Sequence, residues 1–163
     1  MTQPHTIRDW MKREVVSVRP EATVAEAAAL LVEKKVGTLP VVDAEGVLVG
    51  VTTITDITHI FLPDFVSLMG DIDFVKDYGN METPSPEDLQ RAKSLHVYDV
   101  MKEPVAVEDD CALVRALSVM EKHNLPDLPV VKEGRLVGIA SRVDIGRSFL
   151  TDWMQEPETA EEG

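Results

Sequence analysis

Two stretches of the chain, LPVVDAEGVLVGVTTITDI at residues 39–57 and LPVVKEGRLVGIASRVDI at residues 128–145, share one pattern. In each, two runs of mainly apolar residues flank a turn that contains glycine, which predicts an antiparallel hairpin. In each, the second run ends at a hydroxyl residue followed three positions later by aspartate, which is typical of a helix start. The shared pattern indicates that the fold is built from an internal repeat.

The repeat continues on the N-terminal side of both stretches. TIRDWM at residues 6–11 aligns with HVYDVM at residues 96–101, and VSVRPEATVAEA at 16–27 aligns with VAVEDDCALVRA at 105–116. Copies of roughly fifty residues are each too small to bury a sizeable core alone. We therefore expect them to pack together as one pseudo-symmetric module.

The order of elements within each copy follows from local patterns. In the first copy, Val15–Val18 predicts a short strand, and the helical spacing of apolar residues over Thr23–Lys35 predicts a helix. Thr23 and Glu26 have the spacing of a capping box at its start. With the hairpin and the second helix, each copy has the order βαββα. The predicted fold class is α/β of the α+β type, with a small mixed sheet.

The repeats divide the chain into four segments: a first domain at 1–62, an insertion at 63–95, a second domain at 96–150 and a tail at 151–163. Apolar residues at 60–69 recur at helical spacing, and TPSPEDLQRAKSL at 83–95 begins with turn signals and then turns helical. We expect a partly helical insertion. The tail is acidic and is expected to be disordered.

Composition narrows the function classes. The 163 residues include 16 Lys+Arg and 29 Asp+Glu, so the formal net charge is −13, which disfavours binding to nucleic acid. Cys111 is the single cysteine, which excludes an internal disulfide and a multi-cysteine zinc site. No apolar run has the length of a membrane span or a signal peptide, so we expect a soluble, cytoplasmic protein without a membrane partner.

Recognised catalytic patterns do not occur in the sequence. It has no nucleophile elbow, no P-loop, no glycine-rich dinucleotide motif and no paired-histidine metal spacing. Acidic residues of the insertion offer oxygen atoms to a divalent cation, but such runs are usually solvated faces. We expect neither an enzyme nor a bound metal.

The two strand-to-helix junctions, GVTTITD at residues 50–56 and GIASRVD at 138–144, have two interpretations. A hydroxyl at a helix start suits a phosphate, and a carboxylate one turn later suits the two hydroxyls of a ribose. Hydroxyl-x-x-Asp is equally a plain capping box that stabilises a helix by about 1 kcal/mol. Finding it twice does not separate these interpretations, because duplicated helices duplicate their caps.

The ordered set of motifs resembles a tandem cystathionine-β-synthase (CBS) domain pair, or Bateman module, of the small bacterial stand-alone type. The resemblance covers residues 6–62 and 96–150. It rests on the openings that end at Met11 and Met101, on the V-x-V strands, on the Leu-Pro-Val-Val segments and on the two junctions. It implies a non-catalytic regulatory module that senses an adenine nucleotide (AMP, ADP or ATP, with or without Mg²⁺) in clefts between the two copies.

The resemblance also implies roles for individual residues. Asp56 and Asp144 would hold ribose hydroxyls, and Thr53 and Ser141 would reach phosphate. Each cleft would combine the opening of one copy with the junction of the other, so Met11 and Val16 would face Ser141 and Asp144, and Met101 and Val105 would face Thr53 and Asp56. Backbone atoms are expected to line the adenine slot, and the residues that contribute them are Val16, Thr38, Leu39, Pro40, Val105, Asp127, Leu128 and Pro129.

The two copies differ at positions that would touch a ligand. Thr38 of the first copy is matched by Asp127, which would repel phosphate, and Ile54 is matched by Arg142, which would attract it. We expect unequal clefts, with Ser141, Arg142 and Asp144 forming the better phosphate site. Asp127 would also suit the sulfonium of S-adenosylmethionine, which is one alternative ligand.

The sequence also predicts protein partners. The second helices are expected to present apolar faces that the two copies alone do not cover, which predicts a homodimer. A further, unidentified protein would be the target of regulation. The alternative function is a protein-interaction or dimerisation module with unliganded clefts, with the apolar residues 60–69 as its partner surface.

Overall fold

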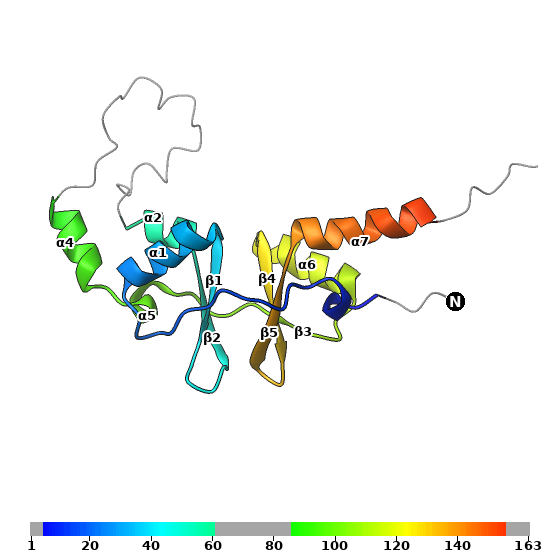
Figure 1. Ribbon diagram of the computed structural model, residues 1–163, viewed down its shortest axis with the longest axis horizontal. Helices are drawn as coiled ribbons and strands as arrows, with labels where there is room; N and C mark the ends of the chain where they lie inside the picture. The colour runs from blue at the N-terminus through cyan, green and yellow to red at the C-terminus, as the bar shows by residue number, and fades with distance from the viewer. Residues whose placement is uncertain (1–4, 61–85, 156–163) are drawn as a thin grey trace, which may run out of the picture. The chain divides into compact units, whose positions relative to one another are not determined.

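The computed structural model describes residues 5–60 and 86–155. The described residues form two compact units: unit 1 comprises residues 5–15 and 105–155, and unit 2 comprises residues 16–60 and 86–104. The opening segment of each repeat thus belongs to the unit that holds the hairpin of the other repeat. Each unit contains a small sheet and helices (Figure 1), which confirms the predicted α+β class.

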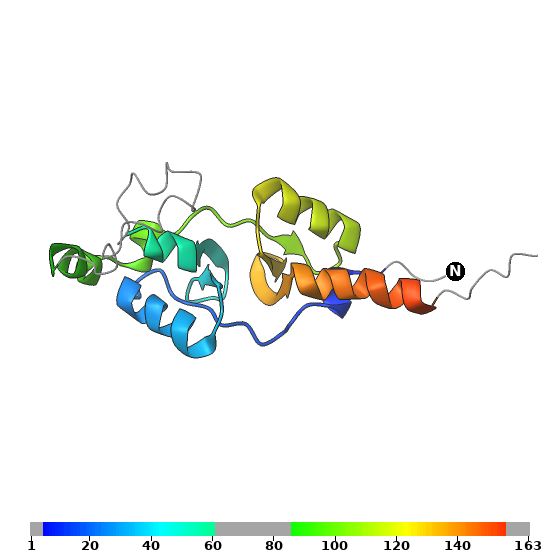
Figure 2. The same cartoon turned by 90° about the horizontal axis from the view of Figure 1, so that it is seen from above.

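Unit 2 is built on an antiparallel hairpin. Its described elements are α1 (Val24–Lys34), β1 (Thr38–Val42), β2 (Leu48–Thr53), α2 (Ile54–Thr58), α4 (Pro86–Ser94) and α5 (Val97–Val100). The turn of the hairpin points away from α1 and α2 (Figure 1), which lie side by side when the view is turned (Figure 2). The core of unit 2 is centred on buried Leu31, Leu39 and Val41.

Local signals set the limits of these elements as the sequence predicts. The Thr23 hydroxyl accepts a hydrogen bond from the Glu26 amide at 3.1 Å, and the Glu26 carboxylate accepts one from the Thr23 amide at 3.0 Å. This capping box begins α1, and Lys35 ends it in a left-handed conformation at φ 53°. In the hairpin turn, the Asp43 carboxylate accepts hydrogen bonds from the amides of Glu45 and Val47.

The strand predicted at Val15–Val18 is wrong as an element. Among the described residues of this segment, Val18 forms one isolated parallel bridge with Val41. The Val18 amide donates to the Pro40 carbonyl at 3.0 Å, and its carbonyl accepts from the Val42 amide. The β-branched pattern thus marks a segment that pairs with the sheet at one residue, and one residue is too short to form a strand.

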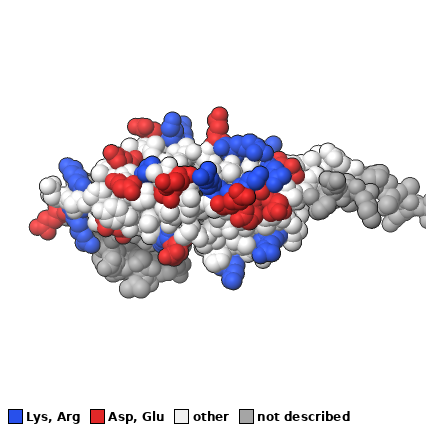
Figure 3. All heavy atoms as spheres, turned by 90° about the horizontal axis from the view of Figure 1, so that it is seen from below, with Lys and Arg blue, Asp and Glu red and all other residues white. Residues whose placement is uncertain are grey.

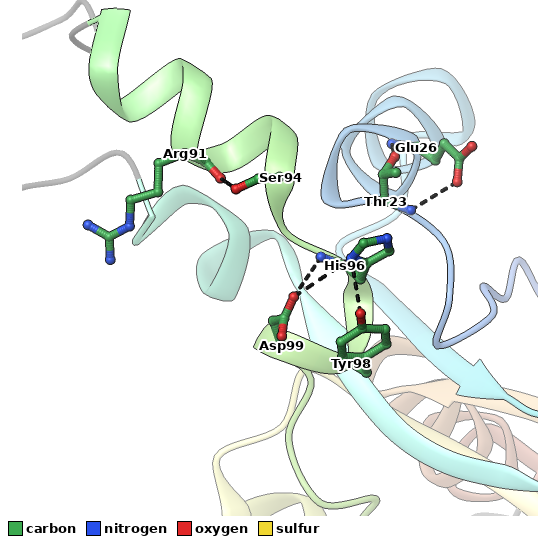
Figure 4. A network of polar contacts seen from close by, with 7 residues as sticks. All are labelled: Thr23, Glu26, Arg91, Ser94, His96, Tyr98 and Asp99. Atoms are coloured by element: carbon green, nitrogen blue, oxygen red, sulfur yellow. Dashed lines mark hydrogen bonds and ion pairs between the residues drawn. The ribbon is translucent and has the colours of Figure 1, made fainter.

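The opening segment of the second repeat packs against the start of α1 in unit 2. The Val97 amide donates to the Ala22 carbonyl at 2.8 Å, and Thr23 and His96 form an antiparallel bridge. Figure 4 shows His96 stacked on Tyr98, with ring centroids 5.0 Å apart, and the Asp99 carboxylate accepting from the His96 amide. These contacts hold the segment that leads to Met101.

Unit 1 repeats the arrangement with one more strand. Its described elements are the 3-10 turn η1 (Ile7–Asp9), β3 (Val107–Glu108), α6 (Leu113–His123), β4 (Asp127–Lys132), β5 (Arg135–Ser141) and α7 (Arg142–Gln155). Strand β4 lies between β3, to which it is parallel, and β5, to which it is antiparallel. Helices α6 and α7 lie side by side (Figure 2), over a core that includes Ile7, Met120 and Leu128.

The β4–β5 turn consists of Glu133 at φ 53° and Gly134 at φ 80°. Two consecutive positive φ values are the signature of a type I′ hairpin turn, for which glycine is favoured. The next element differs from expectation, because α7 continues to Gln155. The tail predicted to be disordered from residue 151 is therefore helical over 151–155. Apolar residues at helical spacing extend that far: Phe149, Leu150, Trp153 and Met154.

The insertion is described in part. Helix α4 at Pro86–Ser94 lies within the helical stretch predicted for residues 83–95. The apolar stretch predicted to be helical at 60–69 lies outside the described residues from 61 onward, as do residues 156–163.

Candidate functional site

Each unit has a capping box at the strand-to-helix junction. In unit 2, the Asp56 Oδ2 atom accepts hydrogen bonds from the Thr53 amide and hydroxyl, both at 2.9 Å. In unit 1, the Asp144 Oδ2 atom accepts from the Ser141 amide at 3.0 Å. The capping interpretation is therefore confirmed at both junctions. It occupies one oxygen of each carboxylate, so it does not conflict with a second role for the other oxygen.

Both carboxylates are shielded from solvent. The side chain of Asp56 is 6% exposed and that of Asp144 is 12% exposed. A carboxylate that loses its water needs hydrogen-bond donors or cations in return. The cap supplies part of this need, and a lysine from an opening segment approaches each carboxylate as well.

These lysines occupy matching positions in the two repeats. In unit 2, the Lys102 ammonium lies 2.6 Å from Asp56 Oδ1. In unit 1, the Lys12 ammonium lies 3.9 Å from Asp144 Oδ2. Sequence analysis did not select either lysine. The signal was present, because the alignment of residues 6–11 with 96–101 places Lys12 over Lys102 when it is extended by one position.

Backbone hydrogen bonds fix the Cα position of each lysine. The Lys102 amide donates to the Val51 carbonyl at 2.9 Å, and the Val51 amide donates back at 3.1 Å. The Lys12 amide donates to the Ile139 carbonyl at 2.8 Å, and the Ile139 amide donates back at 3.0 Å. The backbone of each opening segment is therefore held beside the strand that precedes the carboxylate, which is β2 in unit 2 and β5 in unit 1.

The junction glycines make room for the opening segments. A Cβ atom on Gly50 would lie 2.7 Å from Met101 Sδ, and one on Gly138 would lie 2.8 Å from Met11 Cγ. Both distances are well inside van der Waals contact. Each junction glycine therefore permits close approach of a methionine of the same unit.

Met11 and Met101 are thus placed against the junctions, each within one unit. Val16 packs against the core of unit 2 and Val105 against the core of unit 1. Their expected positions opposite Asp144 and Asp56 stay predictions.

The residues expected around adenine lie next to the junctions through strand pairing. Thr38 pairs with Thr53 across β1–β2, and Asp127 pairs with Ser141 across β4–β5. Leu39 and Pro40 follow Thr38, and Leu128 and Pro129 follow Asp127. These four side chains are fully buried, so their backbone atoms are the part available to line a ligand site.

Arg142, the cation expected to favour phosphate, is held by helix α6 and the segment that follows it. Its Nε atom donates to the Leu125 carbonyl at 2.9 Å, and its Nη1 atom lies 2.9 Å from the Glu121 carboxylate. Both partners face the start of α7. A phosphate ligand at Ser141 would therefore compete with Glu121 for this guanidinium group.

An ion pair supports the opening segment of unit 1. The Arg8 Nε and Nη2 atoms each lie 2.9 Å from Asp109 Oδ2, and the Arg8 amide donates to the Asp109 carbonyl. The hydrogen bond from Arg8 holds the pKa of Asp109 below its usual value. Nearby, burial raises the pKa of the Cys111 thiol. Sequence analysis did not select Arg8 and Asp109, since Tyr98 and Pro20 stand at the matching positions of the other copy.

Figure 3 shows basic and acidic side chains interspersed on the face it presents. Within residues 5–60 and 86–155, no group of three or more His, Cys, Asp or Glu side chains is placed to hold a metal ion. In the same part of the chain, no helix combines the length and the apolar character needed to cross a membrane.

Comparison with known proteins gives one consistent result. Residues 7–63 and 97–150 both match the family model of the CBS domain. The crystal structure of the CBS-pair protein CBSX2 from Arabidopsis thaliana is 28% identical, with a TM-score of 0.73, and covers 94% of this chain and 100% of that chain. A second CBSX2 structure, in complex with AMP, is 29% identical, with a TM-score of 0.68, and covers 91% of this chain and 98% of that chain.

Two sequence relatives illustrate the range of the match. An uncharacterized 17.7 kDa protein of Acidianus ambivalens is 30% identical over 91% of this chain and 76% of its own length. A homoserine O-acetyltransferase of Methanocorpusculum labreanum is 28% identical over 82% of this chain but 22% of the enzyme. The predicted resemblance to a CBS pair is confirmed.

Proposed function

Since the chain belongs to the CBS domain family, we propose that it is a non-catalytic regulatory module that binds an adenine nucleotide. The observation that carries the proposal is the pair of shielded carboxylates, Asp56 and Asp144, at matching junctions. Support comes from the AMP complex of CBSX2, which shares the fold at 29% identity.

Ribose recognition would use the oxygen that the cap leaves available. Adjacent ribose hydroxyls are two donors in a fixed arrangement, which matches a carboxylate acceptor. Asp144 is the more accessible acceptor, because its contacts with Ser141 and Lys12 both fall on Oδ2. Asp56 has its Oδ1 atom in an ion pair with Lys102.

Phosphate recognition would use the hydroxyl and the positive end of the helix at each junction. The junction in unit 1 opens a helix of 14 residues, α7. The Ser141 hydroxyl accepts from the Asp144 amide and so keeps its own proton for a phosphate. The Thr53 hydroxyl already donates to Asp56. We therefore assign the better phosphate site to unit 1, where Arg142 adds a cation at the cost of its bond to Glu121.

Adenine would lie along the backbone of the first residues of β1 and β4, next to Thr38 and Asp127. In this arrangement a nucleotide touches an opening segment and a junction that belong to different repeats. Binding would therefore favour one arrangement of the repeats over another, and a shift of that population is the signal. An unidentified regulated protein, or a second copy of the chain, would detect it.

Helix α7 supports the dimer part of this proposal. It exposes a row of large apolar side chains at helical spacing: Val143, Leu150, Trp153 and Met154. Trp153, the largest of these residues, is 71% exposed. Several large apolar side chains exposed on one helix mark an interaction surface. The same observation favours the second candidate function, a dimerisation or protein-interaction module with unliganded sites.

A thermal-shift screen of the full chain tests the proposal. The panel holds adenosine, AMP, ADP and ATP with and without Mg²⁺, GTP and S-adenosylmethionine. A ligand at about 100 times its Kd stabilises by about 2.7 kcal/mol, which raises the Tm by about 5–10 °C in a protein of this size. A rise confined to adenine compounds is expected. No shift with any compound at millimolar concentration would refute nucleotide binding and leave the interaction module.

A further inference from the structure

Lys102 is anchored at its backbone and free at its charged end. Two backbone hydrogen bonds to Val51 fix its Cα position. Its side chain is 75% exposed, whereas that of its partner Asp56 is 6% exposed. The ammonium group can therefore leave the carboxylate by rotation of its own side chain, and the protein loses no backbone contact when it does.

Every oxygen of Asp56 has a partner. Oδ2 accepts two hydrogen bonds from Thr53, and Oδ1 carries the ion pair with Lys102 at 2.6 Å. A ribose that binds to Asp56 must take Oδ1, since the cap holds Oδ2. The ribose and the lysine ammonium therefore compete for the same oxygen.

We propose that Lys102 determines the specificity of the unit 2 site, because it gives up Asp56 Oδ1 to a nucleotide that carries phosphate and withholds it from an uncharged nucleoside. The inference rests on the proposed function. A nucleoside that displaces Lys102 leaves its ammonium without a counter-charge near the site. A nucleoside phosphate brings an anion to which the displaced ammonium can turn, since a lysine side chain acts as a mobile point charge.

Unit 1 provides the internal comparison. The matching lysine, Lys12, lies 3.9 Å from Asp144, and it approaches Oδ2, the oxygen that the cap already uses. Among the contacts of the described residues, none falls on Asp144 Oδ1. The unit 1 site therefore holds its ribose acceptor ready, and no lysine has to be displaced from that acceptor when adenosine or AMP binds.

The test is titration calorimetry of the full chain with adenosine and with AMP. An Asp144→Ala background removes the acceptor of unit 1, so that the unit 2 site dominates. In that background Lys102→Met should bind adenosine about two- to fivefold more tightly and AMP about two- to fivefold more weakly, the range expected for an exposed ion pair. Lys102→Arg keeps the charge and should keep the preference for AMP. Lys93→Met, an exposed lysine of α4, is the control for a lost surface charge.

Salt concentration gives a readout that a purely structural lysine would not move. Between about 50 and 300 mM NaCl, screening weakens the Lys102–Asp56 pair, so adenosine binding should tighten while AMP binding weakens. Lys102→Met should lose the opposed slopes. If the unsubstituted chain binds neither compound, the proposed function and this inference both fail. If it binds them and Lys102→Met leaves both the AMP preference and the salt slopes unchanged, this inference is overturned and the proposed function stands.

Discussion

Replacement of Gly138 by alanine should destabilise unit 1. A Cβ atom there would lie 2.8 Å from Met11 Cγ and 3.0 Å from the Lys12 carbonyl oxygen. Carbon atoms in good contact lie about 3.5–4.0 Å apart, so the Met11 side chain must move by about 1 Å. Met11 is 9% exposed and packs in the core of unit 1. Crowding of a packed core by one methyl group costs about 1–3 kcal/mol, which is the loss we expect for Gly138→Ala.

Gly146 provides a matched control on the same unit. It lies inside helix α7, and a Cβ atom on it would meet nothing within 4 Å. Glycine inside a helix is less stable than alanine by about 0.5–1 kcal/mol. The same chemical change should therefore stabilise the protein at Gly146 and destabilise it at Gly138.

Urea unfolding followed by tryptophan fluorescence measures both effects. The two tryptophans of the chain, Trp10 and Trp153, belong to unit 1, so the signal reports on the unit that is changed. Met11→Ala provides the decisive background, because it removes the side chain that Gly138→Ala displaces. The cost of Gly138→Ala should fall in that background, and the remaining cost comes from the contact of the added Cβ atom with the Lys12 carbonyl oxygen at 3.0 Å. An unchanged cost in that background, or no cost in the unsubstituted chain, would show that Met11 does not pack on Gly138.

Three further predictions concern single groups of unit 1. Because Arg8 lowers the pKa of Asp109, the carboxylate stabilises the fold above the usual aspartate pKa of about 3.9, and this contribution is lost as the pH falls below that value. The stability advantage over Asp109→Asn should therefore shrink between pH 7 and pH 3 in urea titrations, and a constant difference would contradict the ion pair. Burial raises the pKa of the Cys111 thiol, so a thiol reagent at pH 7.5 should label it more slowly in the folded chain than in urea; equal rates would contradict that burial. Ser141→Ala removes the cap of α7 and should cost about 1 kcal/mol of unfolding free energy, whereas no cost would mean that the Asp144 amide finds another partner.

The parts of the fold that depend on neighbouring residues could be predicted from the sequence. The two hairpins, the α1 helix with its Thr23 box and both hydroxyl-x-x-Asp caps follow from patterns that span fewer than twenty residues. The family could also be predicted, because the order of the motifs in two copies is more specific than any one motif. The placement of Met11 and Met101 at the junctions came from that resemblance, and no local pattern contains it.

The remaining features depend on contacts between distant segments. Sequence analysis overlooked Lys12 and Lys102 because their role appears once the opening segments pair with Ile139 and Val51. It predicted a strand at residues 15–18, where the β-branched pattern is present but a single bridge forms, at Val18. It assigned residues 151–163 to a disordered tail because it weighed the acidic charge of the tail above the helical spacing of apolar residues in 149–154, whereas α7 continues to Gln155.

The central claim is that Asp56 and Asp144 hold the ribose of an adenine nucleotide. A thermodynamic cycle tests it: AMP and its 2′,3′-dideoxy analogue are each titrated by calorimetry into the unsubstituted chain and into the chain with both aspartates replaced by alanine. Charged hydrogen bonds to ribose should give a coupling of about 1.5–3 kcal/mol, so that loss of the hydroxyls weakens binding to the unsubstituted chain and has little effect on the variant. Loss of cap stability affects both ligands equally and cancels. A coupling near zero, with AMP bound in both proteins, would show that these carboxylates are helix caps alone.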